Sequence, residues 1–151
     1  MIDTHAAPYA AFTLRVALGV MFIAHALLKY YVFTLPGTVK FFESLGLPGP
    51  LAYLTFYAEL IGGALILAGA GTRWVAAALI PVLLGATWAH AGNGWVFNAP
   101  NGGWEYPAFL AVAALTQALL GDGKFAVSAL FSWSDITGAT TLNLAERKAL
   151  S

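Results

Sequence analysis

The sequence of 151 residues has the composition of a membrane protein. Hydrophobic residues make up 60% of it, charged residues only 9%, and the mean hydropathy is +0.75, whereas soluble domains are about 25% charged. The formal net charge is zero, which excludes a basic nucleic-acid footprint, and the absence of cysteine excludes disulfides and thiol chemistry.

Four apolar segments predict four membrane-spanning helices, because about 20 mostly apolar residues cross a bilayer. They cover residues 9–31, 51–70, 74–91 and 104–120. We expect the first segment to be a retained span and not a cleaved signal, since Arg15 and Lys29 interrupt it. Pro81 falls within the third, where neighbouring helices allow a kinked helix to continue. The predicted fold is an all-α integral membrane four-helix bundle in residues 1–128, followed by a polar tail, 129–151.

The loop after the first span contains a short amphipathic segment. Within residues 38–45, Val39, Phe42 and Leu45 share one helix face, and glycine and proline follow them. This pattern predicts a short interfacial helix on the membrane surface. An irregular packed loop is the alternative.

Basic residues set the predicted orientation. The side that holds both termini and the second loop carries Arg73, Lys124, Arg147 and Lys148, while the opposite side carries Lys40, with Lys29 at its edge. Because loops rich in Lys and Arg stay in the cytoplasm, we expect both termini to be cytoplasmic. In the tail, Asn143 and Glu146 have the spacing of a helix cap.

Six ionisable side chains fall within the predicted spans or at their edges: Arg15, His25, Lys29, Glu59, His90 and Glu105. A charge in the middle of a span costs about 2.5–3.5 kcal/mol on insertion scales, so such side chains face protein or water and find partners. Three of them, Arg15, His25 and Lys29, lie on one stripe of the first span about 80° wide.

Depth along the helix axes predicts which of these groups meet. At about 1.5 Å per residue, His25 lies roughly 9 Å and Glu59 roughly 12 Å below the outer membrane edge, and Lys29, His90 and Glu105 come near that edge. We therefore predict that these five converge, with Glu59 at the centre beside His25 and Lys29. Alternatively, Glu105 only complements a helix dipole, and His90 is an ordinary interfacial histidine.

Arg15 lies in the inner half of the bundle, away from the other five groups. Gln117 and Thr116 of the fourth span have similar depth, and we expect one of them to shield Arg15 from lipid. Arg15 and Lys29 could instead extend to lipid headgroups. No metal site is predicted, because no pair of ligands has the spacing of a known motif and Lys29 opposes a cation.

Several motifs resemble, in their order, those of the DoxX family. They are residues 14–19 (LRVALG) with the following His25 and Lys29, 58–63 (AELIGG), 103–107 (GWEYP) and 120–123 (LGDG). The resemblance covers about residues 9–128. It implies a four-helix protein of a bacterial or archaeal cell membrane, in a family whose name comes from subunits of quinone-linked oxidoreductases.

The resemblance and the polar residues together suggest a quinone-linked subunit or component of an oxidoreductase complex. The polar cluster of the first two spans would supply hydrogen bonds and protons to a quinone, between aromatic walls formed by Phe22, Tyr57 and Trp88. No haem or flavin motif is visible, so any other redox centre would lie on a partner protein. A non-catalytic assembly or lipid-binding protein and a small-molecule or proton carrier are the alternatives. The sequence leaves open whether the chain is an enzyme or forms an oligomer.

Overall fold

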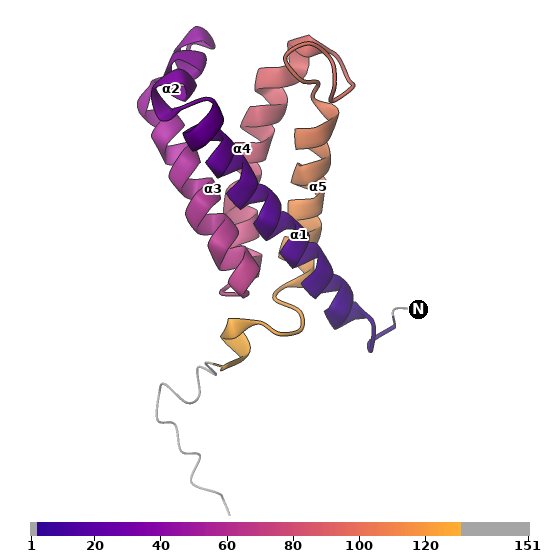
Figure 1. Ribbon diagram of the computed structural model, residues 1–151. Coiled ribbons are helices and arrows are strands. Elements are labelled where there is room, and N and C mark those ends of the chain that lie inside the picture. Colours follow the sequence, from indigo (N-terminus) through magenta and orange to yellow (C-terminus); the bar gives the residue numbers. More distant parts are fainter. Residues whose placement is uncertain (1–2, 131–151) are drawn as a thin grey trace, which may run out of the picture.

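A computed structural model of the protein describes residues 3–130, which form a helical bundle (Figure 1). Its helices are α1 (Ala7–Leu27), α2 (Leu35–Ser44), α3 (Pro50–Ala68), α4 (Thr72–His90) and α5 (Glu105–Leu120). A π-helical turn, Leu28–Val32, continues α1, and 3-10 turns occupy Ala91–Asn93 and Val127–Leu130. The predicted cap at Asn143 and Glu146 lies outside the described residues.

The predicted all-α membrane bundle is confirmed, with one difference in length. Within the described residues, α1 with its π turn, α3, and α4 with its 3-10 turn are long and apolar enough to cross a membrane. Helix α5 is apolar but has 16 residues, so at about 1.5 Å per residue it is shorter than a hydrocarbon core of about 30 Å. Helix α4 continues unbroken through Pro81.

The predicted surface helix is α2, which begins three residues before the expected start. The reason is a cap: the Thr34 hydroxyl accepts a hydrogen bond from the Gly37 N–H at 3.2 Å, which satisfies a donor that the first turn leaves free. The amphipathic segment thus extends to ten residues.

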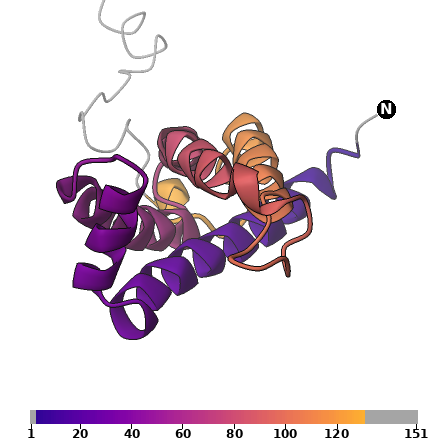
Figure 2. The same cartoon turned by 90° about the horizontal axis from the view of Figure 1, so that it is seen from above.

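Helix α1 packs along α3, and α4 packs along α5. Figures 1 and 2 show α1 crossing the other helices obliquely. Two glycines permit the close approach of α1 and α3, as small residues do in membrane helix pairs. A Cβ at Gly19 would lie 2.8 Å from Leu67 Cβ, and one at Gly63 would lie 2.9 Å from Phe22 Cβ. Larger side chains at either position would separate the two helices.

The bundle has two distinct ends in Figure 1. Helix α2 and the loop of residues 91–104 lie at one, which we call the loop end. The start of α1, the turn between α3 and α4, and residues 121–130 lie at the other, which we call the strap end, and we call residues 121–130 the strap.

Candidate functional site

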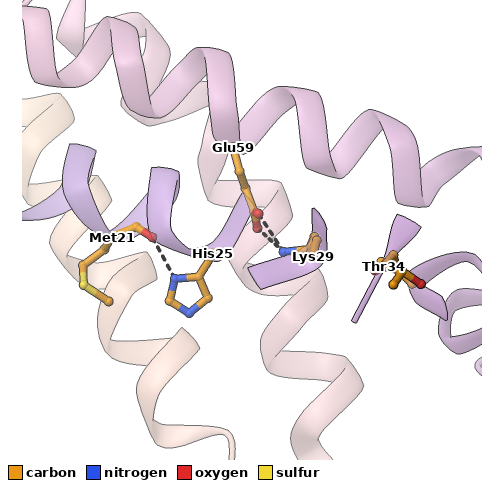
Figure 3. A network of polar contacts seen from close by, with 6 residues as sticks. Met21, His25, Lys29, Thr34 and Glu59 are labelled. Atoms are coloured by element: carbon orange, nitrogen blue, oxygen red, sulfur yellow. Dashed lines mark hydrogen bonds and ion pairs between the residues drawn. The ribbon is translucent and has the colours of Figure 1, made fainter. Parts of the chain in front are cut away.

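An ion pair joins the π-helical turn that continues α1 to helix α3, and it is the polar centre of the loop half of the bundle (Figure 3). Lys29 Nζ donates to both carboxylate oxygens of Glu59, at 2.8 and 2.6 Å. The Glu59 side chain is 8% exposed and the Lys29 side chain 17%. Each charge therefore satisfies the other where solvation is poor, and the predicted pairing of Glu59 with Lys29 is confirmed.

The backbone of α1 is irregular where it carries Lys29. The π-helical turn Leu28–Val32 is closed by a hydrogen bond of 3.0 Å from the Phe33 N–H to the Leu28 carbonyl oxygen. Such turns insert an extra residue into a helix and occur often at functional sites. Lys29 therefore lies both in the irregular stretch of backbone and in the ion pair.

Aromatic residues lie close in the sequence to both partners of the ion pair. Tyr30 follows Lys29 and stacks on Phe56, with ring centroids 6.1 Å apart, and Phe56 lies one helical turn before Glu59. Two of the predicted walls lie elsewhere. Phe22 is buried in the core, and Tyr57 lines a groove between α3 and α4. No feature of the sequence distinguished Tyr30 from an ordinary interfacial tyrosine.

His25 lies one turn from Lys29 but has contacts of its own. Its Nδ1 is 2.8 Å from the Met21 carbonyl oxygen, and because a carbonyl only accepts, Nδ1 carries the proton. The ring stacks on Tyr106 of α5, with centroids 5.7 Å apart, and Figure 3 shows it turned away from the Glu59 carboxylate. The predicted cluster of three is therefore an ion pair plus a separate histidine that contacts α5.

His90 and Glu105 hold the loop of residues 91–104 and do not join the ion pair. His90 Nδ1 lies 3.1 Å from the carbonyl oxygens of Asn101 and Gly102, and Glu105 Oε1 accepts a 2.9 Å hydrogen bond from the Phe97 N–H. The predicted convergence of five groups is thus corrected. Within residues 3–130, no three histidine or acidic side chains gather closely enough to hold a metal ion.

Arg15 is buried at the strap end, with 1% of its surface exposed. Its Nη1 donates to the Asp122 carbonyl oxygen at 2.6 Å, and its Nη2 donates to the Phe125 carbonyl oxygen at 3.1 Å. The expected shielding from lipid is found, but the partners differ from those predicted. Gln117 donates instead to Gly121, and Thr116 donates to a carbonyl within α5.

The Asp122 side chain joins the strap to the start of α4 and also bonds within the strap, a role that the sequence did not predict. Its Oδ1 accepts a 2.7 Å hydrogen bond from the Thr72 N–H at the start of α4, and its Oδ2 accepts one of 2.5 Å from the Ser128 hydroxyl. The Lys124 N–H donates a hydrogen bond to the carbonyl oxygen of Pro8, at the start of α1. The strap therefore joins α1, α4 and α5. The only available signal was an acidic residue between two glycines after a helix.

The surroundings of Asp122 predict a pH dependence at the strap end. Burial alone would raise the pKa of Asp122, but hydrogen bonds from Ser128 and Thr72 and the charge of Arg15 together lower it below its ordinary value. The ionised carboxylate therefore stabilises the fold fully above its unfolded pKa of about 3.9, and this contribution is lost as the pH falls through the lower folded pKa.

We expect the melting temperature of Asp122→Asn to lie below that of the unchanged protein at pH 6 and to approach it as the pH falls toward 3. Thermal unfolding of the two purified proteins across this range measures the difference, and comparing them removes the contribution of other carboxylates. A difference in melting temperature that stays constant with pH would show that ionisation of Asp122 does not stabilise the fold.

One comparison with known proteins, to a family model, extends over helices α1 to α4. Residues 10–92, more than half of the chain, match the sequence model of a family described as DoxX. A stretch of 73 residues is 42% identical to a Bacillus subtilis (strain 168) protein named "Putative oxidoreductase CatD", covering 48% of this chain and 53% of that protein. The chain thus matches about half the length of this relative. No solved structure matches it.

Proposed function

Because this chain belongs to the DoxX family, we propose that it is a quinone-binding membrane component of an oxidoreductase system. The observation that carries the proposal is the Lys29–Glu59 ion pair, a charged donor and a proton acceptor held in the bundle beside a π-helical turn. The name of the Bacillus subtilis relative, "Putative oxidoreductase CatD", also supports a role in an oxidoreductase system.

The pair has the chemistry that a quinone head group needs. A quinone carbonyl oxygen accepts hydrogen bonds, and the Lys29 ammonium has three N–H donors. Reduction of a quinone to a quinol takes up two electrons and two protons. Glu59 would pass protons to the reduced oxygen, and the electrons would come from a redox centre on a partner protein. The exposed ring of Tyr30, which stacks on the buried Phe56, offers a flat surface for the head group.

Quinone analysis of the purified protein tests this proposal. We expect organic extracts of the protein, isolated in a mild detergent, to contain about one quinone per chain by liquid chromatography. Lys29→Gln and Glu59→Gln should lose it, whereas His90→Gln, which changes a loop contact at the same end, should retain it. An unchanged protein without quinone, or equal retention in all variants, would overturn the proposal.

We also propose that the chain spans the cell membrane several times with both termini in the cytoplasm. Arg73 and Lys124 belong to the strap end, and the sequence that follows α5 contains two more basic residues, Arg147 and Lys148. Lys40 and Lys124 are both exposed and lie in α2 and in the strap. In intact cells, cysteine placed at position 40 should react with a membrane-impermeant thiol reagent, and cysteine at position 124 should react only after lysis. The reverse pattern would invert the topology.

A further inference from the structure

An open pocket of about 500 Å³ lies where the loop of residues 91–104 meets the start of α5. Four aromatic side chains line it, Trp95, Phe97, Tyr106 and Phe109, together with the acidic residue Glu105. It is separate from the Lys29–Glu59 pair, which lies between α1 and α3. Aromatic faces with a single carboxylate among them are the surroundings that favour an organic ammonium group.

The charge of Glu105 is free to act on such a ligand. Its Oε1 accepts one neutral hydrogen bond, from the Phe97 N–H, and no basic side chain among residues 3–130 forms an ion pair with it. The pocket lining contains no cationic residue. An anionic ligand would therefore meet repulsion, whereas a cationic group would meet both the carboxylate and the negative faces of the rings.

The surroundings of the pocket point to a lipid as the source of the ammonium group. Trp95 packs edge-on against Trp104, with centroids 4.5 Å apart, and membrane proteins place such aromatic residues at the level of the headgroups. From the pocket, exposed apolar side chains continue along α5: Phe109, Val112 and Leu119 are 69%, 62% and 71% exposed. This stripe would contact an acyl chain while the ammonium end of the headgroup occupies the pocket.

We propose that this pocket binds the headgroup of a zwitterionic phospholipid that carries a free ammonium, with Glu105 and the aromatic rings around the ammonium and an acyl chain along α5. Because Tyr106 both lines the pocket and stacks on His25, the bound lipid would also brace α5 against α1. This site goes beyond the quinone proposal and does not depend on it.

Native mass spectrometry of the purified full chain tests the site. The protein is mixed with equal amounts of phosphatidylethanolamine and phosphatidylglycerol that have the same acyl chains. We expect about tenfold preferential retention of phosphatidylethanolamine, which lies between the scales of an exposed and a desolvated cation–π contact. Glu105→Gln keeps an acceptor for the Phe97 N–H but removes the charge, and it should abolish the preference. Phe109→Leu, at an exposed position, should lower retention of phosphatidylethanolamine.

Trp74→Ala is the matched control, since Trp74 is an exposed aromatic residue outside the pocket, and it should keep the full preference. Soluble glycerophosphoethanolamine, which has the headgroup but no acyl chains, should not displace the bound lipid. The proposal is overturned if the unchanged protein retains both lipids equally or prefers phosphatidylglycerol. It is also overturned if Glu105→Gln keeps the preference, if Trp74→Ala loses it, or if the soluble headgroup competes as well as the lipid.

Discussion

Replacement of Lys29 by Met should lower the free energy of unfolding by about 2–3 kcal/mol, somewhat less than the loss for a fully buried pair because Lys29 is partly exposed. The substitution leaves the Glu59 carboxylate without its only cationic partner among the described residues. Glu59→Leu should cost less, since the longer Lys29 side chain can extend toward the membrane surface. The double variant should lie within about 1 kcal/mol of the unchanged protein, because neither charge is then left unpaired.

Chemical unfolding of the four proteins in lipid micelles gives this double-mutant cycle. Arg73→Met is a control, because Arg73 is exposed and makes one long contact of 3.3 Å to Leu119; it should change stability by less than about 0.5 kcal/mol. Additive effects of the two single substitutions would show that the pair is not coupled. A stable double variant that has lost quinone would separate the functional role of the pair from its structural role.

Substitution of Gly69 by Ala should strongly destabilise the strap end. Gly69 ends α3 with φ +76°, where a side chain costs about 1–2 kcal/mol. The added Cβ would also overlap the Arg15 guanidinium and lie 2.7 Å from the backbone Cα of Ala126. Overpacking of this kind adds about 1–3 kcal/mol, so we expect a total loss of about 2–5 kcal/mol.

Gly71→Ala is the matched control in the same turn. Gly71 has φ +64° and nothing within 4 Å of its would-be Cβ, so only the backbone strain should appear. Limited proteolysis with trypsin reports on the strap, because cleavage after Lys124 requires the strap to leave the start of α1. Cleavage should be faster in Gly69→Ala than in Gly71→Ala. Equal rates would contradict the tight packing of the strap beneath Gly69.

Hydropathy predicted the helices well because the length of an apolar run reports directly on the thickness of a bilayer. The depth of charged residues along the predicted helices also predicted the Lys29–Glu59 pair, since two opposite charges at similar depth in poor solvent have few other ways to be satisfied. The prediction that His90 and Glu105 would join this pair was wrong, because depth gives no information on which way a side chain points around the helix axis. The prediction that His25 would contact Glu59 was wrong, because the His25 ring hydrogen-bonds instead to the Met21 carbonyl oxygen, one turn earlier in the same helix.

The strap could not be predicted from the kinds of residue it contains. Arg15 is bound by the backbone carbonyl oxygens of Asp122 and Phe125, and every residue type carries such an oxygen. A search for a polar side chain at the depth of Arg15 therefore selected Gln117, although that side chain is turned to Gly121. What the sequence does show, an acidic residue flanked by glycines, fits an ordinary turn equally well.

The position of Arg15 near the start of the chain has a consequence for biosynthesis. Its acceptors on Asp122 and Phe125 follow it by 107 and 110 residues. At translation rates of about 5–20 residues per second, these acceptors are made about 5–20 s after Arg15. The first helix must therefore enter the membrane with an uncompensated guanidinium, held by water, lipid phosphate or the insertion machinery. Docking of the strap is then a late step of assembly that follows synthesis of helices α1 to α5.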